Sequence, residues 1–368
     1  MRIFVPCSLL PVPCSQIRCS LWYNSLSDST MKTPWLKLLL FKLFLSFLTV
    51  CLVFGTATPV KASPTVNSCP EGMTFIPGGT FKMGSDVYYP SERSADDVTV
   101  ESFCIDKYEV TNSEFAKFVK ETGYITVAER PLSSEQFPDL TEEQRAPGSL
   151  VFQMPDNGVR PVGYLSWWKW TPGADWQHPF GPKSNIRGKK NYPVVHVAYE
   201  DVQAYAKWAG KSVPTEAQWE YAAHGGLDDA TYSWGQQYSA KKANTWQGFF
   251  PFFNTKTDGH TGTAPVGSFE PNGYGLYDIT GNVWEWTSDW YSIGHHGKAH
   301  SLNPTGPNQK ESFDPREPGV AKHVIKGGSY LCAPNYCSRY RPAARESQSP
   351  DTGTTHIGFR LVKPDKIS

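Results

Sequence analysis

Residues 326–345 read K-G-G-S-Y-L-C-A-P-N-Y-C-S-R-Y-R-P-A-A-R and place two cysteines, Cys332 and Cys337, five positions apart among glycines, tyrosines and arginines. Thiols this close in the chain can meet across a short loop. Two convergent thiolates can form a disulfide, exchange one, or bind a soft metal ion. The spacing alone leaves a local disulfide and a soft-metal site open, and it makes this segment the candidate centre of the chemistry.

The composition of the whole chain limits the classes of partner. Of its 368 residues, 39% are hydrophobic and 19% charged, with 35 basic residues against 35 acidic ones. Because the charges balance, the chain has no net positive charge to attract nucleic acid or an anionic membrane. We therefore expect no nucleic-acid partner. The 31 glycines and 30 prolines predict many turns and little regular secondary structure. The 13 Trp, 18 Tyr and 20 Phe can supply the apolar contacts that hold such a chain together.

Residues 1–62 are expected to be an N-terminal extension and a signal peptide. Met31 begins a segment with three lysines, an apolar run follows over residues 43–54, and V-K-A-S marks a cleavage site near Ala62. Because the apolar run is short for a bilayer span, cleavage is favoured over a single-pass anchor, and no stable membrane insertion is expected after it. The mature chain, residues 63–368, is then exported to a periplasm, a lumen or the extracellular medium.

The mature chain keeps four cysteines in a compartment where disulfides persist. Cys69 leads the first predicted strand, and Cys104 lies in the strand S-F-C-I-D. We therefore favour a structural Cys69–Cys104 disulfide over cross-pairing. This choice leaves Cys332 and Cys337 facing each other.

Hydrophobic periodicity predicts short strands and three helices. Two strands are expected around residues 77–79 and another over residues 98–110. The helices are expected to run from Thr111 or Asn112 to Gly123, from about residue 200 to Gly210, and from a Thr215–Gln218 capping box to residues 224–226. Residues 126–191 have no steady period but carry four tryptophans, which makes them a long loop and a candidate groove wall.

Several motifs then follow one another in an order that resembles the formylglycine-generating enzyme (sulfatase-modifying factor) family. They are F-x-M-G-S, Y-E-V-T-N-S-E-F, P-V-V-H-V-A-Y-E-D, W-A-G-K-S-V-P-T-E-A-Q-W-E-Y-A, G-N-V-W-E-W-T-S-D-W, K-G-G-S-Y and G-F-R, and they cover residues 70–364. The resemblance implies an α+β fold with low regular secondary structure, a variant of the C-type lectin fold. It also implies that residues 63–368 form a single sulfatase-modifying-factor-type catalytic domain.

The motif G-G-S-Y-x-C-x-x-x-x-C-x-R-Y-R marks the members that generate formylglycine, and this chain matches it. The resemblance implies an oxidoreductase that uses O2 and a thiol reductant to convert the cysteine of a C-x-P-x-R segment, in an unfolded sulfatase polypeptide, to formylglycine. The thiolates of Cys332 and Cys337 would hold copper(I), because two thiolates form a soft, low-coordinate site. Ser329 would lie beside the metal and position oxygen or the substrate sulfur, a role that we favour over the alternative of an ordinary strand hydroxyl.

The resemblance also implies two structural calcium sites. The first would use Asn244 and Asp258 with the backbone around Thr245 and His260, and the second Asp278 and Glu285 with backbone oxygens of Gly281 and Val283. Oxygen ligands of this kind suit a hard cation. Taken without the resemblance, the same carboxylates would be interpreted as solvated or turn-capping groups.

Residues 174–184, A-D-W-Q-H-P-F-G-P-K-S, resemble the family block that lines the peptide groove. Trp176 and His178 are therefore expected to contact the substrate, with packing inside the loop as the alternative. Neither His178 nor His196 lies in an H-x-x-x-H-x-E pattern, which is typical of the iron-binding sulfoxide synthases of this family. The sequence thus disfavours that branch.

The chain departs from secreted members of the family at four positions. Additional cysteines of those members are replaced here by Ala206, Ala223, Pro342 and Leu361. Both corresponding disulfides must therefore be absent. Two alternative functions stay open: a lectin-like binding module with a permanent Cys332–Cys337 disulfide, and a family oxidoreductase with another substrate.

Overall fold

The computed structural model describes residues 69–364 except residues 94, 136, 156–163 and 296–298. The expected signal peptide and its cleavage site at Ala62 lie outside these residues. The described residues belong to the unit Asn67–Ser368. None of the helices in this described part is long and apolar enough to cross a membrane.

Local capping signals account for the three α-helices, which agree with the predicted positions. They are α3 (Asn112–Thr122), α4 (Tyr199–Ala209) and α5 (Glu216–His224). Thr111 and Thr215 each form a capping box with the third helical residue, which satisfies backbone donors that a helix start leaves open. The helices end at Gly123, Gly210 and Gly225, whose φ values of 68°, 63° and 63° are left-handed and suit glycine.

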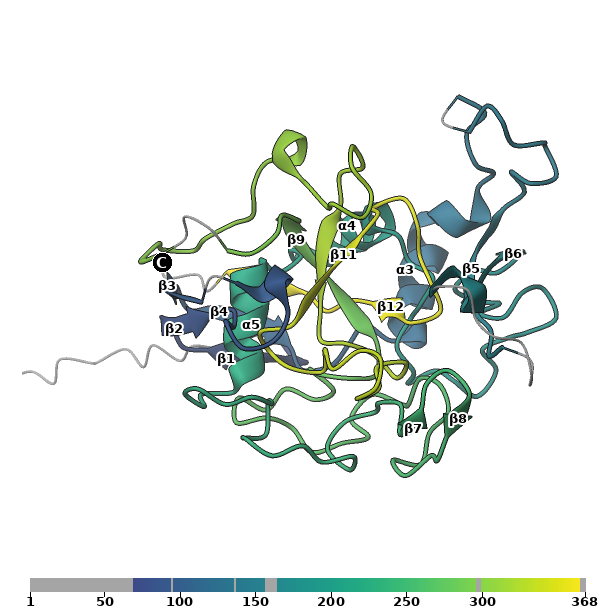
Figure 1. The fold of residues 1–368 in the computed structure, drawn as a ribbon. Coiled ribbons are helices and arrows are strands. Elements are labelled where there is room, and N and C mark those ends of the chain that lie inside the picture. The colour runs from purple at the N-terminus through teal and green to yellow at the C-terminus, as the bar shows by residue number, and fades with distance from the viewer. Residues whose placement is uncertain (1–68, 94, 136, 156–163, 296–298, 365–368) are drawn as a thin grey trace, which may run out of the picture. The chain divides into compact units, whose positions relative to one another are not determined.

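The strands are short and, within the described residues, form five small sheets (Figure 1). One sheet has the order β1 (Met73–Ile76), β4 (Phe103–Asp106), β13 (Val362–Pro364), and a second has the order β11 (Arg345–Gln348), β10 (His323–Lys326), β9 (Trp284–Trp290), β12 (Ile357–Gly358). The remaining pairs are β2 (Gly79–Met83) with β3 (Asp96–Val100), β5 (Gly148–Phe152) with β6 (Trp168–Pro172), and β7 (Gly248–Phe249) with β8 (Phe253–Asn254). Short 3-10 turns are η3 (Pro90–Glu92), η4 (Val127–Glu129), η5 (Tyr164–Trp167) and η6 (Gln309–Glu311).

Two expectations about regular structure were wrong. The strand expected over residues 98–110 is divided into β3 and β4, which belong to different sheets. Residues 126–191 are not a plain loop, because they contain the antiparallel pair β5–β6, in which Leu150 lies opposite Trp170. Pairing between strands decides both features, and the periodicity within a single strand does not detect it.

Aromatic and aliphatic side chains fill the interior in several buried clusters. One cluster joins α3 and α4 through residues such as Phe115, Phe118 and Tyr205 to Trp286 of β9, and it contains both cysteines of the 326–345 segment. Another packs Trp219 of α5 against the strands β1 to β4. Figure 1 shows α5 beside these strands and β9 near the centre of the described unit. The cysteine segment is therefore surrounded by packed structure.

Cys69 and Cys104 form a disulfide, as expected, and it ties the chain before β1 to β4. The four positions where the secreted relatives were expected to carry further cysteines are buried here. They are Ala206, Ala223, Pro342 and Leu361. Apolar packing thus takes the place of cross-links at these positions.

Replacing Cys69 and Cys104 together by serine should lower the free energy of unfolding by about 4 kcal/mol, because the cross-link closes a loop with a sequence separation of 35 residues. Urea unfolding, followed by tryptophan fluorescence, measures the loss. Adding a reductant to the parent should give the same loss, and a parent and double variant of equal stability would contradict the prediction.

Candidate active site

The cysteine segment begins where β10 ends in two consecutive glycines. Gly327 and Gly328 have φ values of 95° and 72°, a left-handed region that is costly for other residues. A Cβ atom at Gly328 would lie only 2.9 Å from the carbonyl oxygen of Arg339. The double glycine therefore lets the chain turn sharply and lets the two ends of the segment approach each other.

A series of backbone hydrogen bonds folds the segment so that its two thiols meet. The amide of Cys332 donates to the carbonyl of Ser329 at 2.9 Å, and the amide of Cys337 donates to the carbonyl of Ala333 at 2.7 Å. The carbonyl of Cys332 also accepts from the amide of Trp246 at 3.0 Å. Both cysteines are buried and free, and their side chains hydrogen-bond to each other. The structure therefore holds a dithiol at this position.

The two thiols differ in acidity. Burial raises the pKa of Cys332 well above its usual value, and its hydrogen bond to Cys337 raises it further. Burial also opposes ionisation of Cys337, but the hydrogen bond from Cys332 and the positive charge of Arg339 outweigh it and lower the pKa of Cys337. Cys337 is thus the first of the pair to become a thiolate, with Cys332 as its hydrogen-bond donor.

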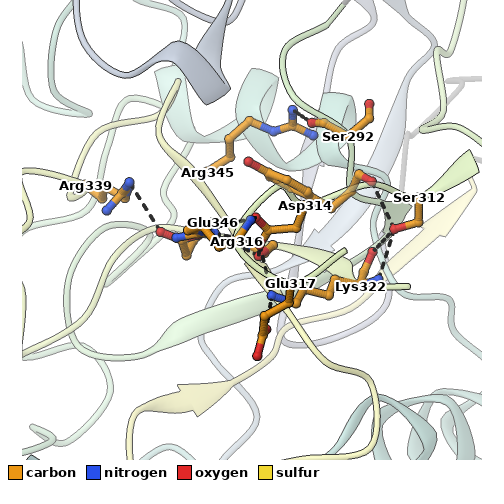
Figure 2. A network of polar contacts seen from close by, with 11 residues as sticks. Ser292, Ser312, Asp314, Arg316, Glu317, Lys322, Arg339, Arg345 and Glu346 are labelled. Carbon is orange, nitrogen blue, oxygen red and sulfur yellow. Dashed lines mark hydrogen bonds and ion pairs between the residues drawn. The ribbon is translucent and has the colours of Figure 1, made fainter. Parts of the chain in front are cut away.

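Arg339 is held by groups on several segments (Figure 2). Its guanidinium lies 4.0 Å from the centroid of the Tyr89 ring and 3.3 Å from Oε2 of Glu346. Glu346 also pairs with Arg316, which donates two hydrogen bonds to the buried Asp314. The charge beside Cys337 is therefore fixed by a chain of ion pairs.

A cavity of about 540 Å³ opens over the dithiol, and we call it the thiol cavity. Ser329, which was expected at the site, lines it together with Cys332 and Cys337. Its lining includes a set of aromatic residues and a set of charged residues, which we call the aromatic wall and the charged wall. The aromatic wall comprises Trp167, Trp168, Phe250 and Tyr336, and the charged wall Arg316, Glu317, Lys322, Arg339 and Glu346. Such a cavity suits a peptide with both apolar and charged side chains.

The aromatic wall is a packed unit. The rings of Phe250 and Tyr336 stack with centroids 4.3 Å apart, and Trp167 meets both rings edge-on at 5.5 Å. Trp167 and Trp168 come from the segment that the sequence marked as a groove wall. Phe250 and Tyr336 were missed, although the position of Tyr336 directly before Cys337 was a usable signal.

Trp176 and His178, which were expected to contact the substrate, have partners within the protein. The Trp176 side chain is only 2% exposed and packs edge-on against Phe115 in the core. His178 pairs through Nδ1 with the carboxylate of Asp175 at 3.1 Å, within its own loop. Neither residue lines the thiol cavity in the described part of the chain. Packing within the loop, the alternative interpretation, accounts for both.

The residues expected at the first calcium site do lie together. Oδ2 of Asp258 accepts from the amide of Thr245 at 3.1 Å, and Oδ1 accepts from the amide of His260 at 3.0 Å. Asn244 is buried nearby, and its amide nitrogen donates to the carbonyl of Gly262 at 2.9 Å. This loop gathers a carboxylate, an amide oxygen and carbonyls, a donor set that fits a hard cation.

The second expected set fits a cation only in part. Both oxygens of Glu285 accept hydrogen bonds from the buried Arg360, at 2.7 and 2.8 Å, and Oε2 also accepts from Trp219 Nε1 at 2.7 Å. Glu285 is therefore a structural ion-pair partner. Oδ1 of Asp278, in contrast, is buried with no hydrogen-bond partner, and so is Oε1 of Glu109.

Glu109 and Asp278 interact electrostatically across this site. Burial raises the pKa of Asp278 to about 6, and burial and the charge of Asp278 together raise the pKa of Glu109 well above its usual value. Burying two carboxylates with unpartnered oxygens costs folding free energy unless a proton or a cation binds between them. At the second expected calcium site, the arrangement thus favours Glu109 as a ligand instead of Glu285, which the sequence had suggested. Gly281, with φ 86°, turns the backbone beside them, two residues before Val283.

Asn282 connects the two expected calcium regions, a role that sequence reasoning missed. Its Nδ2 donates to Glu109 Oε2 at 2.8 Å, and its Oδ1 accepts from Asn244 Nδ2 at 3.0 Å. Asn282 has a φ of 53° and is completely buried. The left-handed conformation of an asparagine was the available signal, because such positions are uncommon and often serve a purpose.

Buried ion pairs fix both ends of the cysteine segment to α5. At one end, Lys326 Nζ lies 2.7 Å from Glu220 Oε2 and 3.6 Å from Glu216 Oε1. At the other end, Arg345 Nε lies 2.7 Å from Glu216 Oε1, and Arg345 also donates to the carbonyl of Ser292 at 2.8 Å (Figure 2). The three glutamate and lysine side chains are completely buried. These pairs position the loop that carries the thiols.

Comparison with known proteins agrees with the motifs of the sequence. The family model "Sulfatase-modifying factor enzyme 1-like domain" matches residues 58–364. The chain is 48% identical over 290 residues to a formylglycine-generating enzyme of Mycobacterium tuberculosis, covering 78% of this chain and 96% of that protein. It is 47% identical over 302 residues to one of Thermomonospora curvata, covering 79% and 93%.

Two more distant relatives complete the comparison. A bovine protein named inactive C-alpha-formylglycine-generating enzyme 2 is 36% identical over 297 residues, covering 79% of this chain and 87% of that protein. Among solved structures, PvdO from Pseudomonas aeruginosa superposes with a TM-score of 0.53 at 26% identity, over 79% of this chain and 94% of that one. The mixed α and β architecture with few helices is therefore shared with a solved relative.

Proposed function

The chain belongs to the sulfatase-modifying factor enzyme 1-like family, and we propose that it oxidises a cysteine in a C-x-P-x-R segment of an unfolded sulfatase polypeptide to formylglycine. Relatives at 47–48% identity carry the name of formylglycine-generating enzymes. The observation that carries the proposal is the buried, free dithiol of Cys332 and Cys337 at the thiol cavity. Two thiols beside a cavity could bind a soft metal ion where the cysteine of a bound peptide could reach it.

Cys332 and Cys337 would hold copper(I), for which a pair of thiolates is a suitable soft donor set. When bound, this ion would supply the reactivity toward O2 that the side chains lack. The acidity difference of the thiols supports the proposal, because one thiolate is already favoured beside Arg339. Ser329 would orient the substrate from the cavity floor.

The remaining side chains would hold the peptide and limit water at the reacting sulfur. The aromatic wall offers apolar contact to the proline of the substrate segment, and Glu317, whose side chain is 51% exposed, offers a partner for its arginine. The overall reaction consumes O2, the cysteine thiol and two equivalents of a thiol reductant. It gives the aldehyde, hydrogen sulfide, water and a disulfide, which balances atoms and electrons.

The proposal is tested with purified protein, copper, a thiol reductant and a peptide containing C-x-P-x-R. We expect a mass change from thiol to aldehyde and capture of the product by a hydrazine. A peptide with serine in place of the cysteine is the matched control and should stay unchanged. If the copper-loaded protein leaves the cysteine peptide intact, the proposal is wrong. Copper binding and O2 consumption without that product would instead indicate another substrate.

A binding module with a permanent Cys332–Cys337 disulfide is the second candidate. A relative at 36% identity is named an inactive formylglycine-generating enzyme, which supports considering a function without catalysis. Titration of thiols in the unfolded, unreduced protein separates the two. The enzyme should show two reactive thiols, whereas the binding module should show none because all four mature cysteines would be paired.

Calcium would serve a structural role at Asn244, Thr245, Asp258 and His260, and at Asp278 with Glu109 and the backbone of Gly281 and Val283. At free calcium a hundred times its dissociation constant, binding should add about 3 kcal/mol to stability. Chelation should therefore lower the Tm, and Asp278→Ala should remove part of this difference. Glu142→Ala, an exposed carboxylate elsewhere, is the control. A Tm that does not respond to calcium would contradict the sites.

Two further properties belong to the same proposal. Export follows from the signal peptide expected before Ala62, and N-terminal sequencing of the secreted or periplasmic protein would check it. The architecture, with few helices and small sheets, is proposed to be a variant of the C-type lectin fold.

A further inference from the structure

A second cavity, of about 710 Å³, lies next to the thiol cavity and has no role in the function above. Its lining includes Tyr199 and Gln203 of α4, Trp290 of β9 and His323 of β10. Thr352 lines both cavities. The two spaces therefore share a boundary.

Strands β9 and β10 each contribute residues to both cavities. In β10, His323 lies opposite Gln348 of β11, and Ile325 lies opposite Glu346. Residues two apart in a strand point to the same face and are about 7 Å apart. His323 lines the second cavity, whereas Ile325 and Glu346 line the thiol cavity. The second cavity therefore adjoins the thiol cavity along β9 and β10, and we call the two cavities together the groove.

The interior of the second cavity is aromatic and firmly held. His323 is stacked between Tyr199 and Trp290, with ring centroids 3.7 and 3.8 Å away, and its Nδ1 lies 3.2 Å from the carbonyl oxygen of Asp289. Burial lowers the pKa of His323 to about 4, so the stack carries no charge at neutral pH. A neutral aromatic floor favours an apolar or aromatic guest.

Charged groups lie at the rim of the second cavity. Arg130 Nη2 pairs with Glu200 Oε1 at 2.9 Å, and these side chains are 40% and 60% exposed. Asp351 is exposed on the segment that separates the cavities. An apolar interior with a polar rim suits one side chain whose backbone stays at the surface.

We infer that the second cavity binds an apolar or aromatic side chain of the substrate polypeptide, outside the segment that the thiol cavity holds. This inference rests on the proposed function, because a polypeptide substrate continues beyond its reacting cysteine. An extended chain advances about 3.3 Å per residue, so it can follow the groove from one cavity into the other. The chain being modified thereby contributes a second recognition element.

The test compares a short C-x-P-x-R peptide with peptides extended on its N-terminal or C-terminal side. Each extension carries one phenylalanine, moved stepwise through a glycine-serine background. Burial of such a side chain stabilises a complex by about 1.5–3 kcal/mol. At one position of one extension, kcat/KM should therefore rise by roughly 10-fold or more over the same extension without phenylalanine.

A variant connects this gain to the cavity. Gln203 is exposed on α4 at the mouth of the cavity, so Gln203→Trp should fill the mouth without disturbing the core. The ratio of kcat/KM between the best extended peptide and the short one should then fall to near one. Lys207→Trp, one turn later on the same helix and outside the lining, should keep the parent ratio.

Failure of the inference can be distinguished from failure of the proposed function. The short peptide reports the reaction by itself, and fluorescence anisotropy with serine-for-cysteine peptides reports binding without turnover. If no phenylalanine position improves binding or kcat/KM, or if Gln203→Trp leaves the ratio at the parent value, the inference is wrong. Oxidation of the short peptide would then still support the function.

Discussion

Replacing Cys337 by serine is expected to reduce aldehyde formation by roughly a thousandfold or more and to abolish tight copper binding, while the protein stays folded. A serine hydroxyl has nearly the shape of the thiol but is a hard and weakly acidic donor, which does not hold copper(I). Serine could still accept a hydrogen bond from Cys332, but the single remaining thiol would offer only one soft donor to the metal. When two catalytic groups act together, removing either one removes most of the activity that the pair provides.

The matched variants separate this effect from a general disturbance of the loop. Cys332→Ser should give a loss of similar size, because the two thiols act together. Ser338→Ala lies directly after Cys337 but outside the lining of the thiol cavity, and it should keep activity within about threefold. Copper affinity is measured by competition with a chelating dye, and folding by circular dichroism. A folded Cys337→Ser protein with parent activity would exclude the dithiol as the reactive centre.

Local patterns in the sequence predicted the parts of the fold that local interactions decide. The helices α3 and α5 begin at capping threonines and all three helices end at glycines, and those signals lie within one turn of each boundary. The division of residues 98–110 into two strands depends instead on their partners, because β3 pairs with β2 whereas β4 pairs with β13, whose residues are distant in the chain. The disulfide was predictable because only one pairing left the two neighbouring thiols together.

The candidate site also combines features that local sequence decides with features that distant residues decide. The pairing of Cys332 with Cys337 follows from short turns inside one segment, so spacing was a sufficient signal. The environment of Glu285 depends on Arg360, 75 positions away, and that of Asp278 depends on Glu109. A carboxylate in a sequence does not reveal whether its partner is an arginine, a cation or water. Trp176 was misplaced for a related reason, because a tryptophan in a loop pattern can point inward as well as outward.

Replacing Lys326 by methionine is expected to lower the free energy of unfolding by about 3–5 kcal/mol, because it removes one partner from a buried ion-pair cluster. Lys326 lies 3.6 Å from Glu216 and 2.7 Å from Glu220, and its loss would leave Glu220 without its lysine partner. Methionine fills a similar volume, so a cavity does not cause the loss. Because Lys326 directly precedes the double glycine, the thiol loop should also become less well positioned, and aldehyde formation should fall.

The dependence on pH identifies electrostatics as the cause. Burial raises the pKa of Glu220 in the folded protein, and Lys326 counteracts that rise. In Lys326→Met the folded pKa should rise further above the unfolded value, so the deficit should be small at low pH, where both states are protonated, and should grow as pH increases. Urea unfolding at several pH values measures it. Lys326→Met combined with Glu220→Gln should recover part of the stability at neutral pH, because no unpaired charge then stays buried at that position. A deficit that is independent of pH and unaffected by the second substitution would contradict the electrostatic explanation.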